Sequence, residues 1–312
     1  MRKRRMLTAG TALVLASSLA LAGCGDDGDD SASKGDVVVV TATFSEIGLM
    51  SQMYAQILED QGYSVETQTV ASRENYAPGL IDGSLDVVPD YLGTMTNYLY
   101  SEADGDPEAT VATSDVEATL EELRTLAEAD GLSVLEPSEA TSQNAYAVSR
   151  DFAEENDLTT LSDLGESDLS IRIAAPEECK SRPLCGVLLE DDYGIDISKY
   201  TPFDFNSVAA KKQVQDGKAD MAVVSTLAAD LDDFGLVILE DDKGLQPAEN
   251  LVPVIGKDSP LADDEDAQAA LDALSAALTS TDLGELIIRV DQDREEIADV
   301  ARDYLESKDL LS

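Results

Sequence analysis

The sequence predicts an α/β protein with two domains. The chain has 312 residues, of which 43% are hydrophobic, enough for one large core or two ordinary ones. Short apolar runs typical of buried strands alternate along the chain with stretches of helical period. The first three strand-like runs are separated by helix-like segments, the pattern of βαβ units with parallel strands.

Residues 1–23 have the layout of a signal peptide. Basic residues Arg2–Arg5 precede an apolar run, Ala12–Leu21, which ends in Leu-Ala-Gly-Cys. This run is too short for a membrane span, which needs about 20 apolar residues. The segment resembles a bacterial lipoprotein signal, which implies that Cys24 is lipidated and anchors the protein to the outer face of the cell membrane. Ordinary secretory cleavage is the alternative.

Residues 24–35 read as a flexible acidic tether, because no residue after the cysteine is apolar and larger than alanine. The folded part then begins with three strands and two helices. The strands are expected at Asp36–Phe44, Tyr63–Val70 and Leu85–Asp90, and the helices at Glu46–Gln61 and Asn75–Asp82. In a parallel sheet, ligands bind at the carboxyl ends of the strands. Pro89, Asp90 and Tyr91 stand at such an end.

The middle of the chain predicts a second α/β set. An acidic amphipathic helix, Val116–Asp130, and a strand, Leu132–Leu135, complete the first set. The later strands are expected at Asn144–Arg150, Ser170–Ala175, Lys199–Phe203, Ala219–Val224, Gly235–Glu240 and Leu251–Ile255. The later helices are expected at Cys185–Asp192, Val208–Asp216, Asp263–Thr279, Asp282–Val290 and Asp291–Glu306.

The last three helices have no strands of their own to cover, so we expect them to return to the first domain. The first lobe would then comprise residues 36–142 plus 243–312, and the second lobe residues 143–242, joined by two crossing segments. A ligand would bind in the cleft between the lobes, which would close by a hinge.

Three cysteines less the proposed anchor leave Cys179 and Cys185. An exported protein meets oxidising conditions, so a disulfide between them is the natural interpretation. A two-thiolate metal site is the alternative, but structural zinc needs four ligands and the chain has no histidine. We therefore expect no metal.

The composition also restricts function. Without histidine, the Ser-His-Asp and Cys-His catalytic systems are impossible, and no nucleotide-binding glycine motif is present. We expect neither an enzyme nor a cofactor. A net charge of −43 disfavours nucleic acid as a partner and would attract a cationic ligand, although solubility in salty surroundings also explains it.

Several stretches carry a resemblance to a known family. FSEIGLMSQMYAQILEDQGYSVE, GLIDGSLDVVPDYLGT, NAYAVSR, SRPLCG and VILEDDKGLQPAENLVPVI follow one another in the order found in substrate-binding proteins of glycine betaine, choline and carnitine ABC importers. The resemblance spans about residues 36–306. It implies the type II periplasmic-binding-protein-like fold, a quaternary amine or zwitterion as ligand, and ABC permease and ATPase subunits as partners.

The resemblance also implies site residues. The family encloses the ligand's quaternary ammonium in aromatic rings, and Tyr91 and Tyr146 match two walls of that box. Thr94 matches a threonine that binds the ligand's polar end, and Arg182 an arginine that binds a carboxylate. The candidate ligand-binding residues are Phe44, Tyr91, Thr94, Asn144, Tyr146, Arg182, Ser225 and Thr226. Tyr91 could instead be a residue at the edge of the core, and Arg182 could brace the cysteine loop against neighbouring acids.

The chain departs from the family at three places. Thr41–Phe44 lacks the lysine that binds a carboxylate, Ala210 or Lys211 stands where a box tyrosine is expected, and Val224 stands at the fourth wall. A lysine there would repel a cation. Either Phe44, Phe203 or Phe205 supplies the missing rings, or the ligand is another small zwitterion or amino acid. A sensor lipoprotein without a transport role is a further alternative.

Overall fold

The computed structural model describes residues 33–42, 44–70, 72–104 and 110–311. The expected signal peptide, the lipidation site Cys24 and most of the expected tether lie outside these residues. Within them, no helix has both the length and the apolar character needed to cross a membrane.

The first five-stranded sheet has the order β2-β1-β3-β10-β4. Its strands are β1 (Asp36–Thr41), β2 (Ser64–Thr69), β3 (Val87–Tyr91), β4 (Ser133–Val134) and β10 (Leu251–Ile255). Strand β1 pairs in parallel with both β2 and β3, as the βαβ pattern predicted, whereas β10 is antiparallel to β3 and β4. The carboxyl ends of β1 and β3 therefore lie at the same edge.

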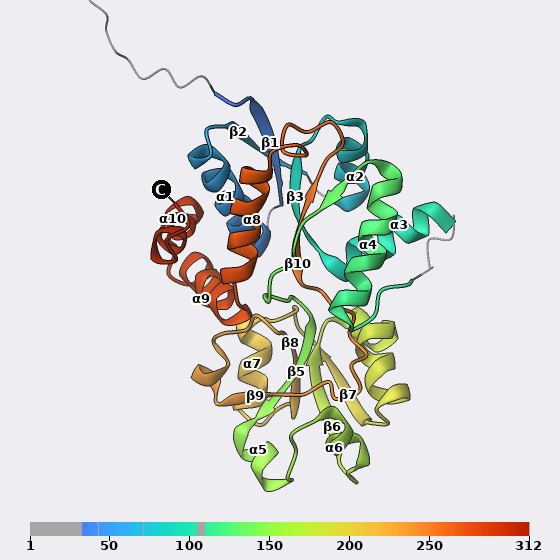
Figure 1. Ribbon diagram of the computed structural model, residues 1–312. Coiled ribbons are helices and arrows are strands. Elements are labelled where there is room, and N and C mark those ends of the chain that lie inside the picture. The colour runs from blue at the N-terminus through green and yellow to red at the C-terminus, as the bar shows by residue number, and fades with distance from the viewer. Residues whose placement is uncertain (1–32, 43, 71, 105–109, 312) are drawn as a thin grey trace, which may run out of the picture. The chain divides into compact units, whose positions relative to one another are not determined.

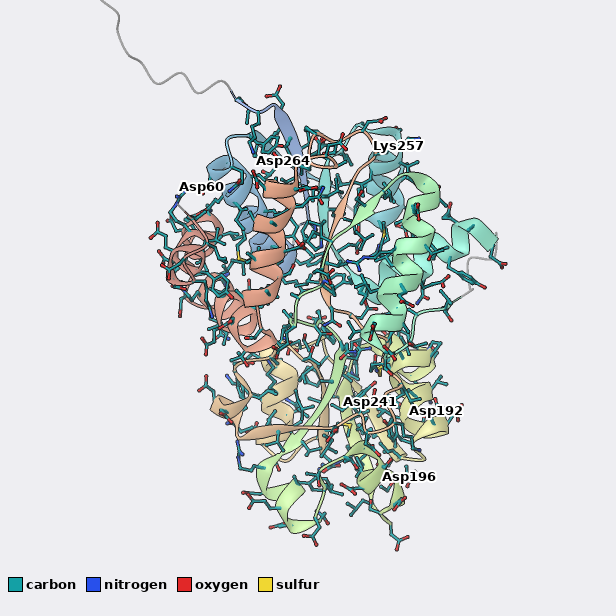
Figure 2. All side chains as sticks on the ribbon, viewed as in Figure 1. Asp60, Asp192, Asp196, Asp241, Lys257 and Asp264 are labelled. Atoms are coloured by element: carbon teal, nitrogen blue, oxygen red, sulfur yellow. A yellow bond between two sulfur atoms is a disulfide. The ribbon has the colours of Figure 1, made fainter. Side chains whose placement is uncertain are left out.

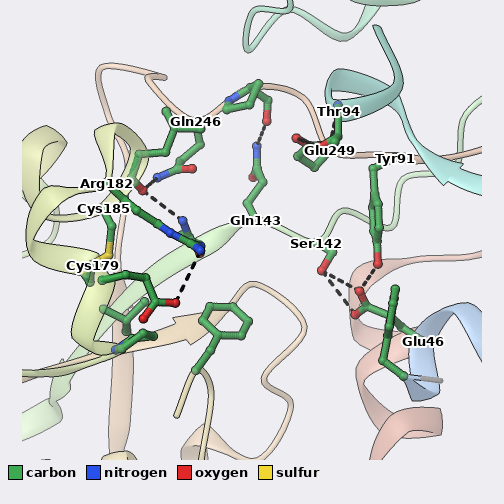
Figure 3. Close-up of a pocket in the computed structure, with 18 residues that line it drawn as sticks. Glu46, Tyr91, Thr94, Ser142, Gln143, Cys179, Arg182, Cys185, Gln246 and Glu249 are labelled. Atoms are coloured by element: carbon green, nitrogen blue, oxygen red, sulfur yellow. Dashed lines mark hydrogen bonds and ion pairs between the residues drawn. A yellow bond between two sulfur atoms is a disulfide. The ribbon is translucent and has the colours of Figure 1, made fainter. Parts of the chain in front are cut away.

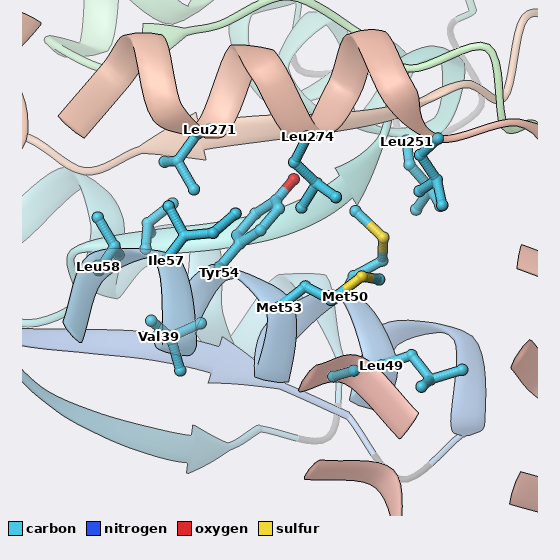
Figure 4. Packing of buried hydrophobic residues seen from close by; sticks show 14 of the residues in the cluster. Val39, Leu49, Met50, Met53, Tyr54, Ile57, Leu58, Leu251, Leu271 and Leu274 are labelled. Atoms are coloured by element: carbon cyan, nitrogen blue, oxygen red, sulfur yellow. The ribbon is translucent and has the colours of Figure 1, made fainter. Parts of the chain in front are cut away.

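Helices cover both faces of the first sheet (Figure 1). One face carries α1 (Ser45–Asp60), α8 (Glu265–Ala277), α9 (Ser280–Asp291) and α10 (Ile297–Ser307), and the other carries α2 (Arg73–Asp82), α3 (Leu92–Asp104) and α4 (Val116–Asp130). Figure 4 shows the core beneath α8, where Tyr54 and Met53 of α1 lie close to Leu271 and Leu274. The last three helices thus pack on the first sheet, where the sequence placed them.

The second five-stranded sheet has the order β7-β6-β8-β5-β9. Its strands are β5 (Asn144–Ser149), β6 (Ser170–Ala175), β7 (Asp196–Pro202), β8 (Met221–Ser225) and β9 (Leu236–Leu239). Around it lie the helices α5 (Arg150–Glu155), α6 (Leu161–Glu166) and α7 (Val208–Gln215), the 3-10 helices η1 (Glu177–Ser181) and η3 (Leu231–Phe234), and the π-helix η2 (Pro183–Asp192). Each sheet with its helices forms one lobe, which confirms the two-lobed α/β fold.

The chain passes from the first sheet to the second between β4 and β5, and returns between β9 and β10. The lobes share a further contact, because Leu227, which follows β8, packs in the hydrophobic core of the first lobe. Gly284 of α9 permits this approach: a Cβ atom at Gly284 would lie 2.7 Å from the Leu227 carbonyl oxygen.

Pro89 lies inside β3, opposite Pro253 of β10, and α3 begins directly after Tyr91, at Leu92. One helix boundary was wrong. Helix α10 starts at Ile297, six residues later than expected, because Arg294 adopts a φ of 64°, which a right-handed helix does not allow.

The acidic residues are distributed over both lobes (Figure 2). Exposed examples are Asp60 on α1, Asp192 at the end of η2 and Asp196 at the start of β7. Such a distribution suits solubility, so the net charge by itself does not identify the ligand.

Candidate functional site

A cavity of about 490 Å³ is lined by residues of both lobes (Figure 3). The first lobe contributes the end of β3, the starts of α1 and α3, and Glu249 just before β10. The second lobe contributes the cysteine loop and Phe205. The segments that cross between the lobes contribute Ser142, Gln143 and Gln246. The cavity therefore lies at the strand ends where the βαβ pattern predicted a ligand site.

Tyr91 belongs to the first-lobe wall. It is the last residue of β3, and its hydroxyl donates a hydrogen bond to Glu46 Oε1 in the first turn of α1. The Ser142 hydroxyl approaches the same carboxylate, at 3.2 and 3.3 Å from its two oxygens. Glu46 thus links α1, β3 and a crossing segment at one point.

Gly93 explains how the chain turns from β3 into α3 beside the cavity. Its N–H donates to the Ala248 carbonyl oxygen at 2.7 Å. A Cβ atom at this position would lie 2.8 Å from that oxygen, closer than packing permits. The absence of a side chain lets the second crossing segment lie against the start of α3, which brings Glu249 to Thr94.

Thr94 and Glu249 make a two-point contact. The Thr94 hydroxyl donates to Glu249 Oε1 at 2.6 Å, and the Thr94 backbone N–H donates to Oε2 at 3.1 Å. The carboxylate therefore occupies the start of α3, where free backbone N–H groups and the helix dipole favour a negative charge. Glu46 stands in the corresponding position at the start of α1.

Both carboxyl groups are affected by their burial. Burial raises the pKa of Glu46, an effect that hydrogen bonds from Tyr91 and Ser142 oppose and the charge of Asp291 reinforces. Burial likewise raises the pKa of Glu249, against the hydrogen bonds from Thr94 and the charge of Arg73. Burial disfavours the ionised form of both carboxyl groups, and a cation bound in the cavity would stabilise that form.

The second-lobe wall is a loop closed by the disulfide between Cys179 and Cys185, whose Cα atoms lie 5.1 Å apart. The predicted disulfide is therefore confirmed. Arg182 projects from this loop with 67% of its side chain exposed, and its guanidinium lies 3.5 Å from Glu178 Oε1. Arg182 thus lines the cavity and also contacts Glu178 within the loop, the bracing role considered for it. Its contact with a ligand carboxylate stays a prediction.

The Leu184 carbonyl oxygen organises the same wall. It accepts hydrogen bonds from Asn144 Nδ2 at 3.0 Å, from the Tyr146 hydroxyl at 3.1 Å and from Gln246 Nε2 at 3.1 Å. Strand β5 and the second crossing segment therefore hold the loop in place from behind.

Three aromatic rings line the cavity. Phe44 precedes α1 and is 48% exposed, Phe205 follows β7 and is 45% exposed, and Tyr91, the last residue of β3, is partly buried. Phe203 packs against the core of the second lobe and is not among the lining residues. Phe44 and Phe205 are thus the phenylalanines in position to replace missing walls.

Among the candidate residues, Phe44, Tyr91, Thr94, Asn144 and Arg182 line the cavity, whereas Tyr146, Ser225 and Thr226 do not. Tyr146 is only 1% exposed and reaches the cavity wall through Leu184. The Ser225 hydroxyl accepts from the Leu227 N–H at 3.0 Å. The Thr226 hydroxyl donates to Thr141 O at 2.6 Å and accepts from the Gln143 N–H at 3.0 Å, so both residues fix the crossing region.

The residues at the two departures in the second lobe are buried. Ala210 and Val224 are both 0% exposed in its core. Lys211 is 3% exposed and forms an ion pair with buried Asp230. It does not line the cavity, so the expected repulsion of a cation by this lysine was wrong.

The sequence interpretation missed the carboxylates, Glu46 and Glu249, and the polar residues of the crossing segments. Glu46 could have been found, because it follows the first parallel strand at the edge where ligands bind. Glu249 gave no such signal, since 64 acidic residues make any one of them uninformative.

No group of three or more histidine, cysteine, aspartate or glutamate side chains suited to a metal ion occurs among the residues that the structure describes. The lining of the cavity is instead aromatic, carboxylate and amide in character. This arrangement can bind a small cation by charge and by the faces of its rings.

Two α/β lobes with a cavity lined from both define a ligand-binding protein of the periplasmic type. The chain belongs to the family described as the substrate binding domain of ABC-type glycine betaine transport systems, which it matches over residues 35–307. Members of this family are substrate-binding components of ABC transporters and not enzymes. The family resemblance and the expectation of a non-enzyme are therefore confirmed.

Named relatives agree with this assignment. The chain is 25% identical to the glycine-betaine-binding protein of Pseudomonas aeruginosa, with 86% of each chain covered. It is 26% identical to the glycine betaine-binding protein YehZ of Escherichia coli K12, with 85% of this chain and 88% of the relative covered.

Solved structures share the fold. The structure of apo YehZ from Escherichia coli superposes with a TM-score of 0.74 at 23% identity, covering 88% of this chain and 99% of that one. A structure described as a glycine betaine/carnitine/choline ABC transporter superposes with a TM-score of 0.76 at 17% identity, covering 89% and 100%.

Proposed function

We propose that this protein captures a small quaternary ammonium compound in the cavity between its lobes and delivers it to an ABC permease and ATPase. The observation that carries the proposal is the meeting of three aromatic rings, Phe44, Tyr91 and Phe205, with the carboxylates Glu46 and Glu249 in one cavity. A quaternary ammonium offers no hydrogen-bond donor, so ring faces and negative charge are the groups that can hold it.

The relatives support the same ligand class. Two relatives that match over most of this chain are named for binding glycine betaine. Relatives at about 25% identity can bind different ligands, so the proposal rests on the residues that line the cavity.

Binding in this proposal involves no covalent chemistry. The ligand enters between the lobes, the rings of the first lobe and Phe205 of the second enclose its head, and the lobes close by a hinge. The residues suited to that hinge lie where the chain crosses: Ser142 and Gln143 on one segment, Gln246 and Pro247 on the other. Thr226 ties the first of these segments to the end of β8.

Anchoring by a lipid on Cys24 forms part of the proposal and rests on the sequence of the signal segment. It places the protein outside the cytoplasm on the outer face of the cell membrane. Globomycin should block processing, and Cys24→Ala should release the protein from the membrane fraction. Unchanged membrane retention of that variant would contradict the anchor.

The transport role is tested by calorimetry of the purified protein with glycine betaine, choline, carnitine, ergothioneine and a panel of amino acids. Micromolar binding of at least one quaternary compound, about −8 kcal/mol, is the expected result. Binding of an amino acid with no response to any quaternary compound would refute the ligand class.

A further inference from the structure

The hydrogen-bond donors on the first-lobe wall are already used by the protein's own carboxylates. The Tyr91 hydroxyl donates to Glu46. The Thr94 hydroxyl and N–H both donate to Glu249, at 2.6 and 3.1 Å. A ligand carboxylate that approached Thr94 would have to displace Glu249, and the negative charge of Glu249 would repel it.

The amide donors on the second-lobe wall and the crossing segments are partly engaged. Asn144 and Gln246 each donate one side-chain N–H to the Leu184 carbonyl oxygen, and Gln143 donates one to the Pro247 carbonyl oxygen. The amides are neutral, so their remaining N–H groups do not offset the charge of the nearby carboxylates. Arg182 contributes a guanidinium to the cavity lining, and it already lies 3.5 Å from Glu178. With 67% of its side chain in solvent, Arg182 holds a ligand carboxylate only weakly.

The charges of the cavity lining also disfavour a ligand carboxylate. Glu46, Glu178 and Glu249 contribute carboxyl groups, and Arg182 is the single basic residue among the described lining residues. The Glu249 carboxylate accepts from the Thr94 backbone N–H at the start of α3, a position that would otherwise suit a ligand anion. Glu46 adds a negative charge in the first turn of α1.

We propose that the cavity selects a ligand with a net positive charge, a quaternary ammonium that carries a hydroxyl group, over a zwitterion that carries a carboxylate. Choline is the simplest compound of this class, and glycine betaine is its zwitterionic counterpart. This inference rests on the proposed function and narrows it. Glu46 and Glu249 are the residues that set the preference, because their free lone pairs accept a ligand hydroxyl and repel a ligand carboxylate.

The matched pair of ligands makes the inference testable. Choline and glycine betaine share the trimethylammonium head and differ only in the group at the other end. The aromatic rings should therefore contribute equally to the binding of both. Isothermal titration of the purified protein at neutral pH and low salt should show choline binding at least about tenfold more tightly than glycine betaine, a difference of about 1.4 kcal/mol.

The variants Glu46→Gln and Glu249→Gln keep the size and one acceptor oxygen of each side chain but remove the charge. Each should weaken choline binding by about tenfold and strengthen glycine betaine binding, because the amide also donates to a carboxylate. Glu59→Gln is the matched control: this exposed residue lies in the last turn of α1, far along the helix from Glu46, and its replacement should change neither affinity.

Each variant should first be shown to melt cooperatively by circular dichroism. If Glu46→Gln fails to fold, Glu249→Gln carries the test alone, since the two residues are held by different partners. Tighter binding of glycine betaine than of choline by the unmodified protein would overturn the charge preference and leave the proposed function standing. No binding of either compound, or of any other quaternary amine, would overturn both.

Discussion

The two walls of the cavity are built in different ways. The first-lobe wall consists of side chains at the ends of β3 and the starts of α1 and α3, fixed by hydrogen bonds to Glu46 and Glu249. The second-lobe wall is a disulfide-closed loop from which Arg182 projects into solvent, with Phe205 half exposed beside it. A fixed wall can define charge and ring geometry, whereas an exposed wall suits closure over a ligand. We therefore expect the free energy of binding to depend more on the first wall.

The largest effect is expected from Tyr91→Ala. This change removes a ring face and leaves Glu46 without its strongest hydrogen-bond donor. Choline affinity should fall by about 100-fold, which corresponds to about 2.7 kcal/mol. Tyr91→Phe is the matched control, because it retains the ring and loses only the hydroxyl, and should cost about tenfold or less. Equal losses in the two variants would show that the ring itself contributes nothing.

Removal of the disulfide should weaken the second wall and the protein's stability together. For a loop of this length, replacing Cys179 and Cys185 by serine should lower the free energy of unfolding by about 2 kcal/mol. Thermal melting measures this loss directly. Choline affinity should change much less than in Tyr91→Ala, because the first wall is untouched. A loss of affinity as large as that of Tyr91→Ala would remove the proposed difference between the walls.

The affinity for a cation should depend on pH through Glu46 and Glu249. Burial raises the pKa of each in the free protein, so each carboxyl takes up its proton at a higher pH than an exposed glutamate does. A bound cation favours the ionised form and releases those protons, so affinity should rise with pH through this window.

The charged groups facing these carboxyls are Asp291 for Glu46, and Arg73 and Asp90 for Glu249, and none of them reverses the sign. Choline binding should weaken as the pH falls from neutral toward the ordinary pKa of glutamate, about 4.3. Calorimetry in two buffers of different ionisation enthalpy detects the released protons. The Glu46→Gln and Glu249→Gln variants should each flatten the dependence, and an unchanged profile in both would assign it to other groups.

The smallest effect is expected from Arg182→Ala. Because the side chain is 67% exposed and paired with Glu178, choline affinity should change by less than about threefold. The same titration with glycine betaine should also show little change. A loss of tenfold or more for glycine betaine would mean that Arg182 holds a ligand carboxylate after closure.

Parts of both walls could be predicted from the sequence. Tyr91 could be placed because the buried run Leu85–Asp90 must end at the ligand edge of a parallel sheet, and the structure puts Tyr91 at the end of β3. The disulfide could be predicted because only two cysteines remained for an oxidising compartment.

What the sequence left open depends on contacts between distant segments. Glu249 reaches Thr94 only because Gly93 lets the crossing segment approach, across 155 residues of chain. The burial of Lys211 depends on its ion pair with Asp230, which the local sequence does not reveal. Tyr146 occupies the expected strand, but its position behind Leu184 follows from the shape of the cysteine loop.

The central claim is that a quaternary cation binds against the first wall. A crystal structure of the protein with choline tests it most directly. The predicted result places the quaternary nitrogen within about 6 Å of the centre of the Tyr91 ring, with the choline hydroxyl directed to the carboxylate of Glu46 or Glu249. Choline held away from Tyr91, with its hydroxyl directed to Arg182 and neither carboxylate in contact, would contradict the claim.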